Sequence, residues 1–149
     1  MKNLLSQPVK DEINKRIDAL SPASKARWGK MNVNQGLRHM ALAFQLATGE
    51  LPSTHTNPPK MPKWLLKFFL LNVKPPKEKV DTFVLMNMVE QGIDPANFEI
   101  EKTNLKNAID NFGSKALLPE NMVAGKFSSN DWGKLNYNHT DHHLRQFGV

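Results

Sequence analysis

Apolar side chains recur at helical spacing in several stretches of the chain, and these stretches predict its helices. The first, residues 9–20, has apolar residues three to four positions apart and ends before Pro22, because proline disfavours a helical residue before it. Its apolar positions are Val9, Ile13, Ile17 and Leu20.

A second helix is predicted over residues 32–48. Asn32 and Gln35 stand three residues apart and form a looser version of the Ser/Thr–Glu capping box. Gly49 is placed for a left-handed stop at the other end.

The next segment, residues 50–93, is the least regular and contains six of the ten prolines. A short apolar helix is predicted over residues 63–72, whereas residues 81–91 fit either a further helical turn or extended chain. So long a connection usually lets the two flanking helices run in the same direction.

Two more helices follow. Asp94 and Pro95 are expected to open the third, since aspartate is a good N-cap and proline suits the first helical position. Its apolar stripe is Phe98, Leu105, Ala108, Ile109 and Phe112, and Gly113 closes it. After a loop, the cap candidates in residues 128–131 open a last helix that runs nearly to Phe147. The sequence therefore predicts an all-α fold in one domain, residues 1–149: a four-helix bundle with a long Pro-rich crossover between the second and third helices.

Composition narrows the possible partners. The chain has a net charge of +6 but no dense basic run, so nucleic-acid binding is not expected. Cysteine is absent, which excludes thiolate metal ligands and a cysteine nucleophile. No signal peptide is readable and the longest apolar run is far below the ~20 residues of a spanning helix, so a cytoplasmic location is expected. The apolar, lysine-containing segment 63–74 fits a lid or a dimer contact better than a membrane-docking helix.

The histidines carry the functional argument. His139 and His143 lie one turn apart on one face of the last helix, beside its apolar stripe, so both imidazoles can reach one ion. His39 projects inward from the second helix in the same way. Inward histidines from two facing helices can supply three neutral nitrogen ligands and leave a coordination position open.

The alternative to a metal site is a hydrogen-bonded core histidine, which is the usual state of a single inward imidazole. His142 lies beside the pair and fits either a ligand or a group at the rim, where it is a candidate proton acceptor. His55 stands among prolines and polar residues and is expected in solvent. Asp141 points away from the pair and is not expected to be a ligand.

Two functions fit such a site. A metal-dependent enzyme would use the open position to activate a water or a thiol, and Gln35 and Gln146 would orient an imidazole or a bound water. A non-catalytic protein would bind metal or a small ligand only. Either way an anionic small molecule is favoured at the open position, because three imidazoles do not neutralise the ion. The ligand type suits Zn²⁺, Ni²⁺, Cu²⁺ and Fe²⁺ alike.

Two segments resemble a known family. Residues 129–148, SNDWGKLNYNHTDHHLRQFG, resemble the end of DinB/YfiT-like proteins, most closely an uncharacterised branch that ends in W-G…Y-x-H-x-x-H-H-L-R-Q-F. Residues 27–50 match the same branch around Arg27-Trp28-Gly29 and His39.

The resemblance implies a four-helix bundle with a long crossover and a three-histidine site for Ni²⁺ or Zn²⁺. By motif position the ligands carry over to His39, His139 and His143. It also implies a possible homodimer, and, since some relatives transfer low-molecular-weight thiols, a thiol as co-substrate.

Overall fold

The computed structural model describes residues 2–52, 60–77 and 83–149. This described part is mostly helical, with one short two-stranded hairpin, in keeping with the predicted all-α class. Its elements are α1 (Gln7–Asp18), α2 (Val33–Thr48), α3 (Lys63–Asn72), the 3₁₀ turn η1 (Val84–Met86), α4 (Phe98–Asp110), β1 (Glu120–Asn121), β2 (Gly125–Lys126) and α5 (Ser129–Gln146). In the described part of the chain, no helix is long and apolar enough to cross a membrane.

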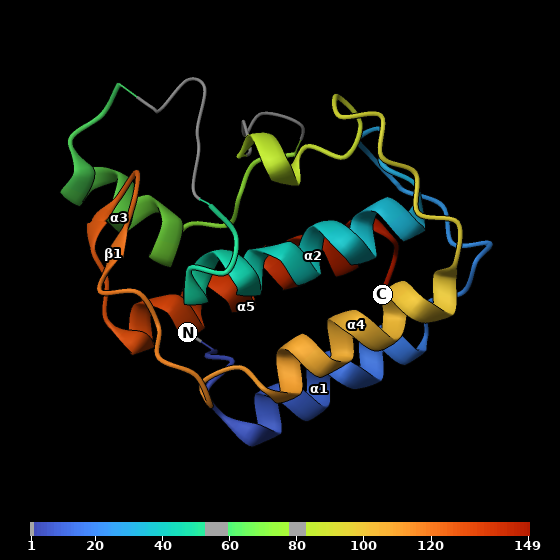
Figure 1. Cartoon of the computed structure of the whole chain (residues 1–149), viewed down its shortest axis with the longest axis horizontal. Coiled ribbons are helices and arrows are strands. Elements are labelled where there is room, and N and C mark those ends of the chain that lie inside the picture. The colour runs from blue at the N-terminus through green and yellow to red at the C-terminus, as the bar shows by residue number, and fades with distance from the viewer. Residues whose placement is uncertain (1, 53–59, 78–82) are drawn as a thin grey trace.

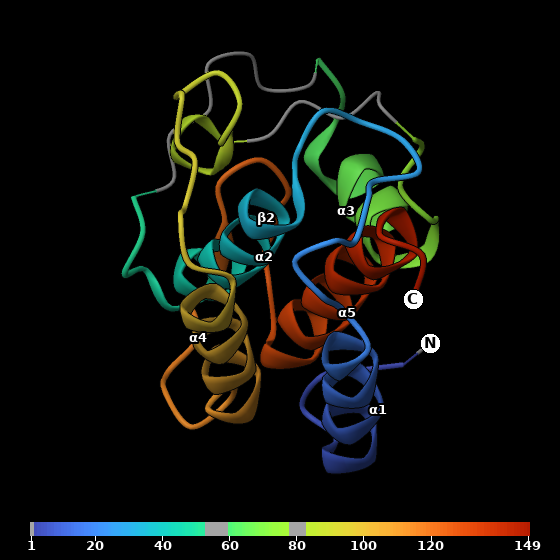
Figure 2. The ribbon, with the colours of Figure 1, turned by 90° about the vertical axis from the view of Figure 1, so that its right-hand side faces the viewer.

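Four helices surround the core. α1 packs on α4 and α5, and α2 packs on the same two helices from the other side. α2 and α4 run in the same direction, as the long connection between them predicts, whereas α5 runs opposite to α2 (Figure 1). Figure 2 shows α3 on the side of α5 away from α1, where it contacts α5 and β2.

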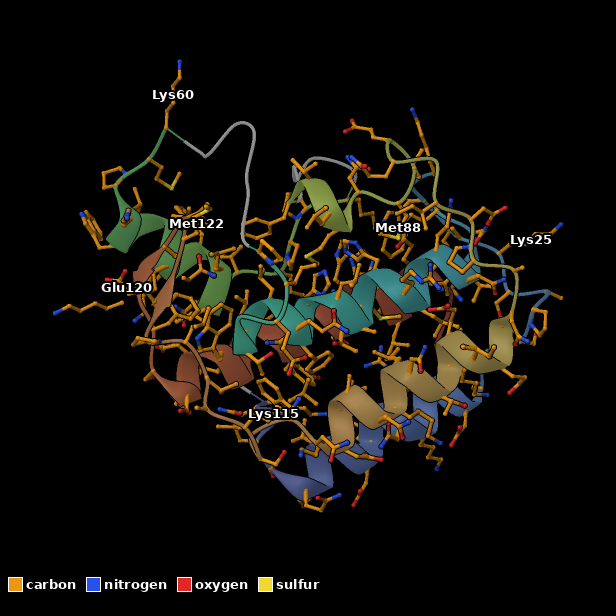
Figure 3. The ribbon with its side chains drawn as sticks, in the orientation of Figure 1. Lys25, Lys60, Met88, Lys115, Glu120 and Met122 are labelled. Carbon is orange, nitrogen blue, oxygen red and sulfur yellow. The ribbon has the colours of Figure 1, made fainter. Side chains whose placement is uncertain are left out.

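The main core is a cluster of apolar side chains from all four of these helices. Charged side chains such as Lys25 and Lys60 project outward (Figure 3), whereas Met88 is buried. Fully buried members of the cluster are Ile13 and Ile17 of α1, Leu37 and Met40 of α2, Leu105 and Ile109 of α4, and Leu144 of α5.

The predicted ends of α2 are confirmed. The Asn32 side chain accepts from the backbone N–H of Gln35, and the Gln35 side chain accepts from the backbone N–H of Asn32. Gly49 follows with φ of +79°, a left-handed conformation that glycine adopts without a steric cost. This capping box and stop fix where along α2 the face carrying His39 begins and ends.

The predicted helix over residues 63–72 is confirmed as α3. For residues 81–91 the sequence fits either a helical turn or extended chain. In the part that the structure describes, residues 83–91, the chain forms η1 followed by turns. η1 packs against α2, and Met86 joins a small apolar cluster with Ala43 and Leu46.

The predicted start of α4 is wrong. The helix begins at Phe98, and its N-cap is Asn97, whose side chain accepts from the backbone N–H of Ile100. Asp94 and Pro95 instead serve α2: the Asp94 carboxylate accepts from the Asn32 side chain at 2.7 Å, and the Pro95 carbonyl accepts from the Asn34 side chain at 2.7 Å. These bonds tie the end of the crossover to the start of α2.

The hairpin β1–β2 was not expected from the sequence, which predicts only a loop there. It pairs Glu120 with Lys126 and leads directly into α5. α5 starts at a capping box between Ser128 and Asp131, one of the predicted candidates, and the Trp132 indole donates to the Leu118 carbonyl at 2.6 Å. The hairpin and this bond anchor the beginning of the helix that carries two histidines.

Candidate metal centre

Three imidazoles converge between α2 and α5. His39 lies in the middle of α2, and His139 and His143 lie one turn apart in the second half of α5. Their ring centroids form a nearly equilateral triangle with sides of 4.8, 4.6 and 4.7 Å. One nitrogen of each ring lies within 4.8 Å of the other two. Two nitrogens bound to one tetrahedral zinc ion lie about 3.4 Å apart, because Zn–N bonds are about 2.0–2.1 Å long, so modest movements of the rings would bring these atoms to bonding positions.

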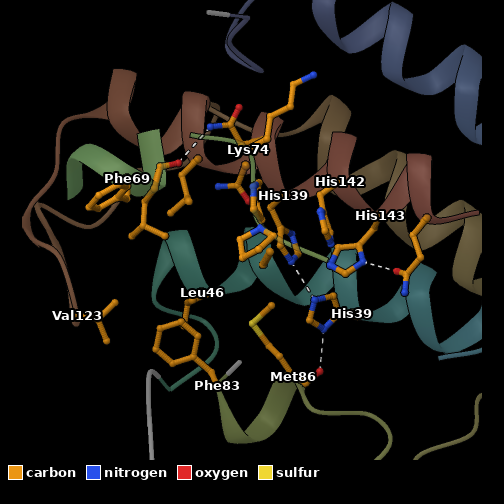
Figure 4. A pocket seen from close by; sticks show the side chains of 18 of the residues that line it. His39, Leu46, Phe69, Lys74, Phe83, Met86, Val123, His139, His142 and His143 are labelled. Carbon is orange, nitrogen blue, oxygen red and sulfur yellow. Dashed lines mark hydrogen bonds between the residues drawn. The ribbon is translucent and has the colours of Figure 1, made fainter. Parts of the chain in front are cut away.

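His39 is fixed by a backbone oxygen. Its Nδ1 lies 2.8 Å from the carbonyl oxygen of Met86, at the end of η1. Since a carbonyl can only accept, Nδ1 carries the hydrogen and the Nε2 atom of the neutral ring keeps its lone pair. That lone pair turns toward the other two histidines (Figure 4).

His143 is fixed by a side-chain amide. Its Nδ1 lies 2.8 Å from Oε1 of Gln146, and the Gln146 amide nitrogen donates to the Trp28 carbonyl at 2.7 Å. The Trp28 carbonyl requires the NH₂ group on its side, which leaves the amide oxygen for His143. His143 therefore also donates from Nδ1 and presents its Nε2 lone pair, the arrangement usual behind histidine metal ligands.

His139 completes the cluster. Its Nε2 lies 2.9 Å from Nε2 of His39. Because His39 has its lone pair there, the His139 ring donates a hydrogen at Nε2 when the cluster binds only protons. The Nδ1 atom of His139 is then a buried acceptor with no partner among the described residues. If a cation replaced the proton between the two rings, the Nε2 lone pairs of His39 and His139 could both bind it. The residues present therefore fit a metal ion.

The protonation state suits ligation. Burial lowers the pKa of His39, and burial together with neighbouring imidazoles lowers the pKa values of His139 and His143 well below the ordinary value. All three rings are therefore neutral near pH 7, the form that binds metals. The cluster itself contains no carboxylate among the described residues.

A cavity of about 590 Å³ adjoins the histidines. Figure 4 shows the histidines toward one end and Phe69 and Val123 toward the other. The wall between them is mainly apolar and comes from α2, α3, η1 and α5. It includes Leu46, Leu66, Leu70, Phe83, Met86 and Leu135, and four asparagines also line the cavity, Asn87, Asn121, Asn136 and Asn138.

The remaining predicted site residues are distributed as follows. His142 lines the cavity beside the cluster, with its ring centroid 5.0 Å from that of His143 and 5.7 Å from that of Trp28. His55 lies outside the described residues. Asp141 forms ion pairs with Arg16 and Arg145, on the side of α5 away from the cluster.

The prediction for Gln35 is wrong. Its amide oxygen belongs to the capping box, and its amide nitrogen donates to the Ile93 carbonyl at 2.9 Å, so its polar atoms are engaged away from the imidazoles. Gln146, the other predicted orienting residue, does contact an imidazole.

Sequence reasoning missed two partners of the site, the carbonyls of Met86 and Trp28. Both are main-chain groups in irregular segments, and every residue has such a carbonyl, so residue type gives no signal for them.

The chain was compared with protein families, with curated proteins and with solved structures, and none of the three comparisons finds a match.

Proposed function

We propose that this protein binds one divalent transition-metal ion through His39, His139 and His143. One observation carries the proposal: oxygen acceptors hold the Nδ1–H groups of His39 and His143, which leaves an Nε2 lone pair on each of these rings within the three-histidine cluster. The contact between His39 and His139 can use one of these lone pairs in a hydrogen bond, whereas a bound ion would use both. Zn²⁺ and Ni²⁺ are the proposed ions.

We further propose that the site is catalytic. A bound ion with an open position would acidify a water or a thiol, which points to hydrolysis or to thiol transfer. The thiol would come from a small molecule, because the chain has no cysteine. Within the chain, the cavity holds the substrate beside the cluster, and His142, which lines it, is the proposed proton acceptor.

The proposed class is a DinB-like four-helix bundle, with a homodimer as its assembly. Support comes from the ring of contacts among α1, α4, α2 and α5 and from the common direction of α2 and α4. Further support is that the three imidazoles brought together are those whose positions match the family motif.

A second candidate is a non-catalytic binding protein. It is favoured by the cavity wall, which contains no aspartate, glutamate, serine or threonine among the described residues. Such a wall offers few groups for chemistry besides the histidines.

The test is metal analysis of untagged protein purified without chelators, for the wild type and for His39→Ala, His139→Ala, His143→Ala and His55→Ala. The proposal expects close to one zinc or nickel ion per chain in the wild type and in His55→Ala, and a large loss in the other three. A wild type that holds no ion and takes none up would overturn it.

To separate the two candidates, the metal-loaded protein is assayed with thiol donors and electrophiles and with activated esters. The catalytic proposal expects turnover that needs the metal and falls in His142→Ala at unchanged metal content. Equal rates with and without metal would favour the binding protein.

A further inference from the structure

The wall of the cavity is suited to a mainly apolar ligand. Leu46 and Met86 are nearly fully buried, and Leu66, Leu70 and Leu135 are partly buried around the same space. A volume of about 590 Å³ lies in the range of small-molecule sites. An apolar cavity of this size is costly to leave to water, because its surface offers water few hydrogen bonds.

Polar groups lie at the histidine end. Two atoms of lining residues there are buried without a partner among the described residues, Nδ1 of His139 and Nε1 of Trp28. The indole N–H can only donate. Trp28 belongs to this end because its ring packs on His142. A buried indole N–H calls for a ligand that offers an acceptor.

Charge favours an anion at the same end. Three neutral imidazoles leave the charge of a divalent ion unbalanced, and no acidic side chain among the described residues lines the cavity. Among the described residues that line the cavity, Lys74 is the only lysine or arginine, and its side chain adds positive charge.

We infer that the cavity binds a medium-chain monocarboxylate, with its carboxylate at the histidine cluster and its alkyl chain along the wall toward Phe69 and Val123. This inference rests on the proposed metal site for its head group, whereas the apolar wall is independent of the metal. The carboxylate supplies acceptors and the negative charge, and the chain fills the apolar volume.

The first test is a binding series. Saturated monocarboxylates from butanoate to decanoate, and the matched primary alcohols, are titrated into zinc-loaded and metal-free protein, with the fluorescence of Trp28 and Trp132 or heat as the readout. The expected affinity rises about threefold to fourfold per methylene, since each buried methylene contributes roughly 0.8 kcal/mol. On zinc-loaded protein octanoate should bind at least tenfold more tightly than octanol, and this preference should disappear without zinc.

A matched pair of variants tests where the alkyl chain of the ligand lies in the cavity. Val123→Asp puts a charge at the far end of the cavity, on a partly exposed residue whose replacement the fold should tolerate. This replacement should weaken the binding of decanoate at least tenfold, whereas the affinity for butanoate should stay nearly the same and the zinc content should not change. Val89→Asp, on an exposed residue that does not line the cavity, should change none of these.

Zinc content is measured in the same samples, so that two failures are distinguished. Zinc bound at one ion per chain, without a rise of affinity with chain length or without preference for the acid, overturns this inference alone. If the protein holds no zinc, the proposed metal site is wrong and the assignment of the carboxylate fails with it. The rise of affinity per added methylene, measured on metal-free protein, then decides whether the apolar wall binds an alkyl chain. Equal effects of Val123→Asp and Val89→Asp would also contradict the assignment.

Discussion

The Nδ1 atom of His143 lies 2.8 Å from the amide oxygen of Gln146, three residues further along α5. The same amide donates to the carbonyl of Trp28, in the loop before α2. One side chain therefore connects an imidazole of the cluster to a distant segment and sets which nitrogen of the ring faces the cavity. The orientation of the site depends on this contact.

Gln146→Leu should weaken zinc binding about 10- to 100-fold, as loss of a group that orients a histidine ligand typically does. Leucine has a similar size, but it neither accepts from His143 nor donates to Trp28. Competition with a chromophoric chelator measures the affinity. Gln45→Leu, on an exposed residue of α2, is the control and should have no effect. Unchanged affinity in Gln146→Leu would show that the contact does not support the site.

Gly29→Ala should weaken zinc binding through Gln146. A Cβ at Gly29 would lie 2.5 Å from the Gln146 amide nitrogen, and Gly29 has φ of +78°. Gly92→Ala is the matched control, since Gly92 has φ of +63° and a Cβ there would meet nothing within 4 Å. Both variants should lose about 1–2 kcal/mol of stability from the backbone strain, but only Gly29→Ala should lose affinity. Equal affinities in the two variants would contradict this role of Gln146.

Local signals explain what the sequence predicts well. The caps of α2 at Asn32 and Gly49 depend on residues a few positions apart, and the spacing of His139 and His143 follows from helical periodicity. The direction in which His39 points also follows from the apolar face of its own helix. These features need no knowledge of distant contacts.

Features that depend on distant contacts were not predictable. Gln35 fits both a capping pair and a group near His39, and the cap prevails because a second acceptor, the Ile93 carbonyl, lies within reach of its amide. Asp94 and Pro95 form a good local helix start, yet they bond to the beginning of α2 instead. The cavity likewise depends on how α3 and η1 pack on the helices, which no periodicity records.

The stability of the metal-free protein should fall with acid. Burial lowers the pKa values of His139 and His143 well below the value of about 6.5 expected in the unfolded chain. At pH values between the pKa of the folded state and that of the unfolded state, the unfolded chain binds more protons. The free energy of unfolding is therefore highest above pH 6.5 and falls as the pH decreases. The slope should be about 1.4 kcal/mol per pH unit for each such group.

Urea denaturation between pH 7.5 and 5 measures this slope. The double variant His139→Gln with His143→Gln is the comparison, since glutamine does not titrate. Its unfolding free energy should change less over the same range. Parallel pH profiles for the two proteins would be inconsistent with neutral, buried imidazoles.

Lys10→Met should destabilise the fold and leave the metal site intact. The buried ammonium group of Lys10 donates to the carbonyls of Asp110 and Phe112 at 2.8 Å each, at the end of α4. Its removal leaves these oxygens without their charged donor, at a cost of about 2–3 kcal/mol. Lys15→Met, on an exposed residue of α1, should change stability by less than about 0.5 kcal/mol. Urea denaturation checks both, and an equal effect of the two replacements would contradict the buried role of Lys10.

The most direct test of the metal site is the X-ray absorption fine structure of protein loaded with one equivalent of zinc. The account predicts a first shell with three imidazole nitrogens at about 2.0–2.1 Å and at least one further light atom at the open position. His143→Ala should reduce the imidazole count by one. A spectrum of wild-type protein with no more than one imidazole ligand would contradict the central claim that His39, His139 and His143 bind one ion.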